Sequence, residues 1–170
     1  MAVPVWVPGQ VLTSDDVNTW LVPQPAYKTA VTSRASTTSL QPDPDLQVPV
    51  DAAAVYLVEA TIFFNGVSAS GYLQWNWGVP AGAAIRMLNL YNVEGGGANA
   101  GPVVAEGNAG YAVGPAWTGG TSITYTASLS GLLTTAGAAG LLTWNWSQVV
   151  SNATPTSVLA DSWLKLSRVG

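Results

Sequence analysis

The amino-acid sequence predicts an all-β protein: an antiparallel, jelly-roll-like β-sandwich preceded by an extended N-terminal arm and a short helix. From residue 26 onward, β-branched and aromatic residues recur in short runs separated by turn residues, at intervals typical of a sandwich. The chain of 170 residues is long enough for one hydrophobic core. Long irregular connections favour a jelly roll over an up-and-down meander. We therefore expect two parts, an anchoring arm with its helix at 1–25 and a β-sandwich domain at 26–170.

The arm opens with an apolar stretch, residues 3–9, which we expect to be extended because its two prolines do not fit inside a helix. Thr13 is a good helix N-cap, and Asp15 and Asp16 fall in the first turn, where the helix dipole favours negative charge. The short helix is predicted to end before Pro23. The residues predicted to anchor the arm to another surface are its large apolar side chains: Val5, Trp6, Val7, Leu12, Val17 and Trp20.

About eight strands follow in the predicted sandwich. They are expected at 27–33, 46–50, 54–64, 72–79, 84–93, 123–133, 140–150 and 158–168. Turns are predicted at 42–45, 80–82 and 151–155, where proline, glycine, aspartate and asparagine gather. A glycine-rich stretch at about 94–120 has almost no periodicity, which predicts a long surface loop with one short strand at 103–106.

The sequence Trp-Asn-Trp occurs twice, at 75–77 and 144–146. On a strand both tryptophans of a triplet face one way and the asparagine faces the other. Side chains of this size dominate any core or interface that they join. A core position is favoured, while a ladder between subunits and a platform that stacks sugars remain alternatives. The tryptophans predicted for the core or a subunit interface are Trp75, Trp77, Trp144, Trp146 and Trp163.

Charged residues make up only 8% of the chain, against roughly 25% in a typical soluble domain. Five basic and nine acidic residues cannot cover the exterior of a monomer, which favours association with other subunits. The net charge of −4 disfavours a nucleic-acid partner, because phosphate binding needs clustered lysine and arginine. Glycine, proline and polar residues interrupt every apolar run, so no membrane partner is expected. The N-terminus lacks the pattern of a signal peptide, which predicts synthesis in the cytosol of the producing cell without export.

Residues suited to catalysis are scarce. Histidine and cysteine are both absent, which removes the commonest general base, metal ligand and thiol nucleophile. The two lysines, Lys28 and Lys165, lie in no nucleophile motif. Asp43, Asp45 and Asp51 are close in sequence but lack the spacing of a calcium loop, and solvated turn residues are the favoured interpretation. We therefore predict no catalytic residue, no metal site, no cofactor and no enzymatic activity; a carboxylate-pair hydrolase is the weakest alternative.

The arm also carries a recognisable order of residues. Trp6, Gly9, Leu12, Thr13 and Asn18 follow the pattern aromatic-x-x-Gly-x-x-Leu-Thr-x-x-x-x-Asn. This opening resembles that of short virion structural proteins of tailed phages, of the head-decoration, capsid-fibre or minor-tail-fibre type. The likeness extends more loosely over 34–38, 79–83 and 152–164. The resemblance implies an N-terminal segment that anchors to the particle and a β-sandwich that projects outward, commonly as a homotrimer.

The sequence and this resemblance together predict an oligomeric decoration or fibre-like module on the exterior of a phage virion, docked through its arm. The expected partners are further copies of the chain and the major capsid protein or another virion protein. The alternative is a minor tail or tail-fibre adhesin that binds carbohydrate on the host surface. Its predicted glycan contacts lie in or beside the glycine-rich stretch: Tyr91, Tyr111 and Trp117.

Overall fold

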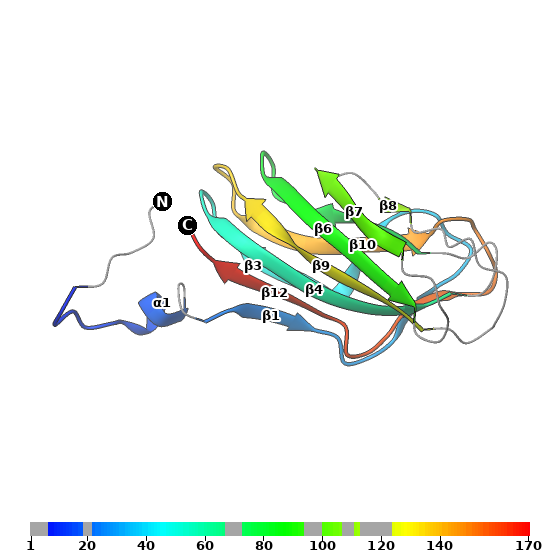
Figure 1. The fold of residues 1–170 in the computed structure, drawn as a ribbon, viewed down its shortest axis with the longest axis horizontal. Helices are drawn as coiled ribbons and strands as arrows, with labels where there is room; N and C mark the ends of the chain where they lie inside the picture. Colours follow the sequence, from blue (N-terminus) through cyan, green and yellow to red (C-terminus); the bar gives the residue numbers. More distant parts are fainter. Residues whose placement is uncertain (1–6, 19–21, 67–72, 94–99, 107–110, 113–123) are drawn as a thin grey trace.

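The computed structural model describes residues 7–18, 22–66, 73–93, 100–106, 111–112 and 124–170, and for 89–93, 100–106 and 111–112 it describes the backbone alone. Two antiparallel sheets pack face to face as a sandwich, and the short helix α1 (Ser14–Asp16) lies beyond one end of it (Figure 1). The predicted fold class is therefore confirmed.

The larger sheet has six strands in its main path and two further strands beside it. Its order is β1 (Gln24–Tyr27), β12 (Trp163–Arg168), β4 (Val55–Asn65), β9 (Thr124–Thr134), β6 (Ala84–Val93) and β7 (Ala100–Glu106). Strand β11 (Thr156–Val158) pairs with β4 and with β2 (Thr32–Arg34). The smaller sheet has the order β3 (Gln41–Val50), β10 (Gly140–Gln148), β5 (Leu73–Gly78) and β8 (Tyr111–Ala112).

The strand order is that of a jelly roll. When β3 to β10 are counted as the first to the eighth strand, the smaller sheet runs 1-8-3-6 and the larger one contains 2-7-4-5. This is the arrangement of two Greek keys wrapped into a double sheet. Strands β12 and β1 extend the larger sheet beyond β4, so this sheet presents the broader outer face.

Alternation along the strands explains where the core lies. In β4 the even-numbered residues 56–64 are buried and the odd-numbered ones face outward, as the two-residue period of a strand requires. Strands β9, β10, β5 and β12 repeat the pattern over at least part of their lengths. The inward side chains of the two sheets meet in a single core that includes Leu46, Tyr56, Ile62, Leu73, Ile85, Leu133, Trp144 and Leu164.

Two strands that were predicted to be continuous are each divided into two in the structure. The strand expected at 27–33 is β1 followed by β2, because the chain turns inward at Lys28, whose side chain is fully buried. The strand expected at 158–168 is β11 followed by β12. Between them Asp161 adopts a left-handed conformation with φ of 66°, which ends one strand before the next begins.

The turn expected at 42–45 lies inside β3. Thr143 of β10 pairs with Gln47, and Asn145 pairs with Pro42. An advance of two residues along β10 therefore corresponds to an advance of five residues along β3. Strand β3 therefore bulges outward from its partner. It is the edge strand of its sheet, where prolines are tolerated because no further strand needs their missing N–H groups.

The loop expected at about 94–120 is partly strand. Strand β7 occupies 100–106 and contains the short strand predicted at 103–106, and β8 occupies 111–112. Glycine and proline weakened the periodic signal here, and pairing with β6 and β5 forms the strands nevertheless. The structure also starts β1 at Gln24, slightly before the predicted domain boundary.

Candidate functional site

The predicted anchoring residues that the structure describes lie on the surface of the arm. Val7 and Leu12 are exposed, Val17 is half-buried, and Val11 between them is 83% exposed. Val5, Trp6 and Trp20 lie outside the described residues. Helix α1 buries no residue, and Figure 1 shows it apart from the two sheets. The arm thus carries apolar side chains that the chain's own core does not use.

Helix α1 is held by its own residues. The Thr13 hydroxyl accepts a hydrogen bond from the Asp16 backbone N–H at 3.1 Å, and the Asp16 carboxylate accepts one from the Thr13 backbone N–H at 3.0 Å. This reciprocal pair is a capping box. The hydrogen bonds from the Thr13 hydroxyl and backbone lower the pKa of Asp16 below its ordinary value. The start of the helix needs no support from the sandwich.

Four of the five predicted core tryptophans lie in the core. Trp144 and Trp146 are completely buried, and Trp75 and Trp77 are nearly so. Trp75 pairs with Trp146 and Trp77 with Trp144 across β5 and β10. Their ring faces are covered, so none of the four offers a surface on which a sugar could stack. Trp163 differs, because it is half-buried on the outer face of the larger sheet.

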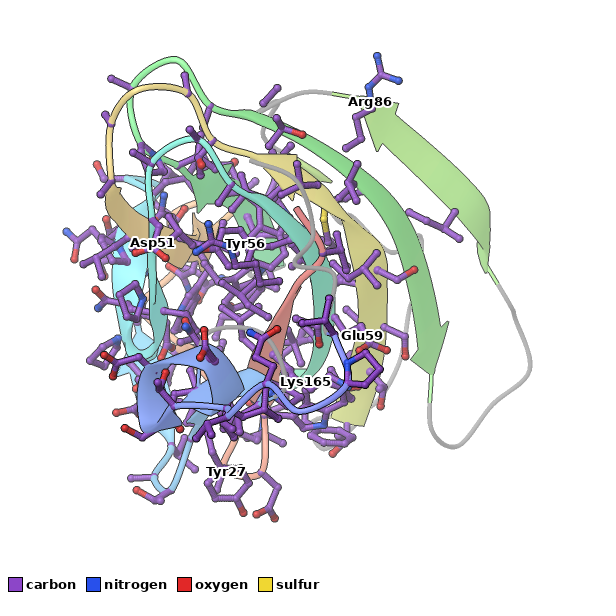
Figure 2. The ribbon with its side chains drawn as sticks, turned by 90° about the vertical axis from the view of Figure 1, so that its left-hand side faces the viewer. Tyr27, Asp51, Tyr56, Glu59, Arg86 and Lys165 are labelled. Carbon is purple, nitrogen blue, oxygen red and sulfur yellow. The ribbon has the colours of Figure 1, made fainter. Side chains whose placement is uncertain are left out.

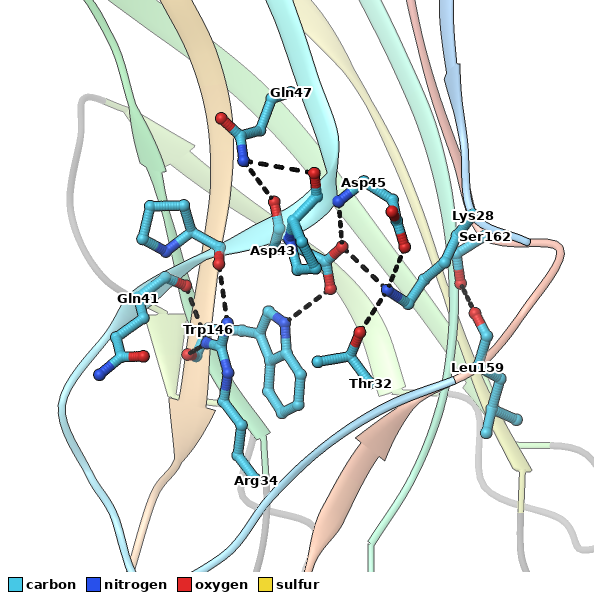
Figure 3. A network of polar contacts seen from close by, with 12 residues as sticks. Lys28, Thr32, Arg34, Gln41, Asp43, Asp45, Gln47, Trp146, Leu159 and Ser162 are labelled. Atoms are coloured by element: carbon cyan, nitrogen blue, oxygen red, sulfur yellow. Dashed lines mark hydrogen bonds and ion pairs between the residues drawn. The ribbon is translucent and has the colours of Figure 1, made fainter. Parts of the chain in front are cut away.

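A buried cluster of polar contacts surrounds Lys28 (Figure 3). The Lys28 ammonium is completely buried, and its three protons have three acceptors. They are Thr32 Oγ1 at 2.6 Å, Asp45 Oδ2 at 2.8 Å and Asp43 Oδ1 at 3.0 Å. The second oxygen of Asp43 accepts a hydrogen bond from Trp146 Nε1 at 3.0 Å. Every charge in this cluster therefore has a partner, as burial in a low dielectric demands.

Arg34 closes the other side of the cluster. Its guanidinium lies over the Trp146 ring, 4.2 Å from the centroid, and donates to the carbonyl oxygens of Gln41 and Pro42 at 2.8 Å each and to that of Trp146. Burial lowers the pKa of Arg34, and the negative charge of Asp43 opposes that shift. The guanidinium thus binds carbonyl groups of β3 and β10 next to the β3 bulge.

This cluster has a structural role. It joins the segment after β1, the bulge of β3 and strand β10, and it leaves no polar atom of Asp43 open to a substrate. Within the described part of the chain, no three acidic side chains converge as a metal ion would require. The sequence interpretation of Asp43 and Asp45 as solvated turn residues was wrong: Asp43 is completely buried, and both carboxylates bind Lys28.

A shallow depression lies on the outer face of the larger sheet. It is lined by Trp163, Glu59, Thr61, Ser128 and Ser130 above Ala60 and Leu129. Glu59 Oε2 binds Lys165 Nζ at 2.6 Å, and Figure 2 shows the two side chains meeting on this face. The sequence analysis placed Trp163 in the core or an interface and did not predict this depression.

The three predicted glycan contacts are not described as side chains. Tyr91 lies in β6 and Tyr111 in β8, each known by its backbone alone, and Trp117 lies outside the described residues. Among the helices that the structure describes, none is long and apolar enough to cross a membrane.

No family model matches the chain, and no curated protein matches it. Two solved structures of infectious bursal disease virus are similar at a low level. The structure of the Gt strain has 16% identity and a TM-score of 0.22, covering 99% of this chain and 47% of that one. For the Gx strain the identity is 12% and the TM-score 0.19, over 100% and 43% of the two chains. The chain spans less than half the length of these matches, and similarity at this level supports no argument about function.

Proposed function

We propose that this chain is a structural subunit on the exterior of a tailed-phage virion, a decoration or fibre-like module that docks through its N-terminal arm and forms a homotrimer. The observation that carries the proposal is the exposure of the apolar side chains in the arm. Its apolar side chains stay exposed while the sandwich completes a core of its own, so the arm has apolar surface for another protein to cover.

The order of residues in the arm supports the virion as the partner. Gly9, Leu12 and Thr13 belong to the opening that resembles short phage virion proteins, and Thr13 serves as the N-cap of α1. A preformed helix start lowers the entropy that docking would otherwise cost. The partner in this proposal is the major capsid protein or another virion protein.

The outer face of the larger sheet supports self-association. Leu57, Leu88 and Leu132 are 46%, 38% and 39% exposed, and Leu57 pairs directly with Leu132 across β4 and β9. A trimer interface at the Leu57–Leu132 end of these strands would cover part of this apolar surface.

A purely structural role without catalysis fits the placement of the charged groups. Asp43 and Lys28, the most buried ionic pair, are held inside the fold by each other and by neighbouring donors and acceptors. The runner-up function, an adhesin for host-surface carbohydrate, draws no support from the side chains of Tyr91, Tyr111 or Trp117.

The first test is docking of purified chain to virus particles that lack it. The double substitution Val11→Asp and Leu12→Asp should abolish co-sedimentation with the particles, while light scattering should give the same mass, three times 17.5 kDa, for variant and parent. Val31→Asp is the matched control, because Val31 is 56% exposed but lies outside the arm, and it should leave docking unchanged. Docking by the double variant would contradict the anchor, and a monomeric parent chain would contradict the trimer.

A further inference from the structure

The depression on the outer face of the larger sheet has two chemically different sides. The register places Trp163 beside Thr61 and Thr61 beside Ser128, in one row across β12, β4 and β9. The next row along the strands contains Lys165, Glu59 and Ser130. An aromatic ring therefore stands at one end of a surface that is otherwise built from hydroxyl groups and one ion pair.

The polar groups of the depression are available to a ligand. Within the described residues, the hydroxyls of Thr61, Ser128 and Ser130 have no side-chain hydrogen-bond partner. Glu59 uses Oε2 for Lys165 and keeps Oε1 free to accept. Each hydroxyl can both donate and accept, so the surface offers both donors and acceptors.

A second aromatic side chain, that of Tyr27, lies next to the Trp163 end of the depression. Tyr27 pairs with Trp163 across β1 and β12, and it is 54% exposed. Its hydroxyl donates to Asp161 in the turn before β12, and this hydrogen bond raises the pKa of Tyr27. The register places Tyr27 opposite Trp163, on the same face of the sheet.

The geometry points to a binding subsite for a neutral saccharide at this depression, with Trp163 as the stacking face and Glu59, Ser128 and Ser130 as hydrogen-bonding partners. A sugar ring has a C–H-rich face that packs on an aromatic ring and hydroxyls that need both donors and acceptors. Glu59 and Lys165 neutralise each other, so the site has no excess charge for a phosphate or a cation. It is also too open to enclose a purely apolar ligand.

This subsite is independent of the docking proposed for the arm. It lies on the sheet and uses none of the residues of the arm. It also uses none of the residues that the sequence analysis gave as carbohydrate contacts. An arm variant that cannot dock should therefore bind saccharide as the parent does, so either proposal can fail alone.

The test uses the full-length protein on an array of neutral oligosaccharides built from glucose, galactose, mannose or N-acetylglucosamine, followed by titration with the best binder. Trp163→Ala should weaken binding at least tenfold. Ser130→Arg removes no core side chain and places a long side chain over the depression, so it should weaken binding similarly even if Trp163→Ala is poorly folded. Leu141→Ala is the control, because Leu141 is exposed on β10 of the other sheet.

Binding that Trp163→Ala and Ser130→Arg reduce and Leu141→Ala leaves unchanged supports the subsite. Three results overturn it. The parent protein binds no neutral oligosaccharide at millimolar concentration, or it binds only sulfated ones added as a separate arm, or both depression variants bind as tightly as the parent.

Discussion

The N-terminal arm and the β-sandwich use the same kinds of residue in opposite ways. In the sandwich, Trp144, Trp146 and Lys28 are completely buried, and both the apolar and the charged groups find partners inside the chain. In the arm, α1 buries nothing and Val11 is 83% exposed. The core of the sandwich thus completes its own interactions, and the arm retains apolar surface for a partner.

The difference shows that exposed apolar residues indicate a binding surface only when the hydrophobic core of the protein is already complete without them. Isolated exposed valines and leucines are ordinary on protein surfaces. Here several of them lie in the described part of the arm, where helix α1 buries no residue, so they stabilise no core of the arm. Changes in the sandwich should therefore alter stability, and changes in the arm should alter docking alone.

The largest expected effect comes from the buried ion pair. Lys28→Met leaves Asp43 as an uncompensated buried charge, so the free energy of unfolding should fall by about 3–5 kcal/mol. Lys165→Met is the matched control: its ion pair with Glu59 is partly exposed, and the loss should be about 0–1 kcal/mol. Urea denaturation of both variants measures the difference. Equal losses of unfolding free energy would show that the buried Lys28 cluster stabilises the fold no more than a surface ion pair does.

A smaller effect is expected for the indole that supports this cluster. Trp146→Phe removes the hydrogen bond from Nε1 to Asp43 and should cost about 1–3 kcal/mol beyond the loss of ring volume. Trp144→Phe loses comparable volume in the same strand, but within the described residues Trp144 Nε1 has no hydrogen-bond partner. The melting temperature of Trp146→Phe should therefore be lower than that of Trp144→Phe. The reverse order would contradict the role given to the indole N–H.

The smallest effect on overall stability belongs to the arm. Because the folded pKa of Asp16 lies below its ordinary value of 3.8, its carboxylate stabilises the helix start above that pH, and this contribution disappears as the pH falls through the lowered pKa. NMR shifts of the Thr13 amide should follow that titration while the core signals stay unchanged. Asp16→Ala should remove the pH-dependent shift, and Asp15→Ala should keep it. A simultaneous change in core signals would mean that the arm and sandwich are coupled.

Much of the fold was predictable because it rests on local periodicity. The alternation in 54–64 and in the two Trp-Asn-Trp triplets identifies strands with one buried face, and Thr13 followed by Asp16 identifies the helix start. Residues 42–45 were predicted to form a turn between strands, and this was wrong because they lie inside β3. What they form is a bulge in an edge strand, and that depends on which strand lies alongside.

The candidate sites were predictable only in part. The arm could be recognised because its apolar residues are contiguous in sequence. The saccharide depression could not, since Trp163, Glu59 and Ser130 come together only when β12, β4 and β9 are adjacent. Within β12 the alternation does place Trp163 on the outer face with Lys165, opposite Leu164 and Leu166, but it does not show which strands lie beside it.

By itself, then, the sequence determined the all-β class, the arm with its capped helix, and the inward faces of the strands, because each follows from residues a few positions apart. The tertiary structure alone decided the strand order, the β3 bulge and the cluster around Lys28. Lys28 meets Asp43 across 15 residues, and Asp43 meets Trp146 across 103. Contacts at such separation form because a buried charge must find a partner in the assembled fold, and local propensity cannot encode which partner that is.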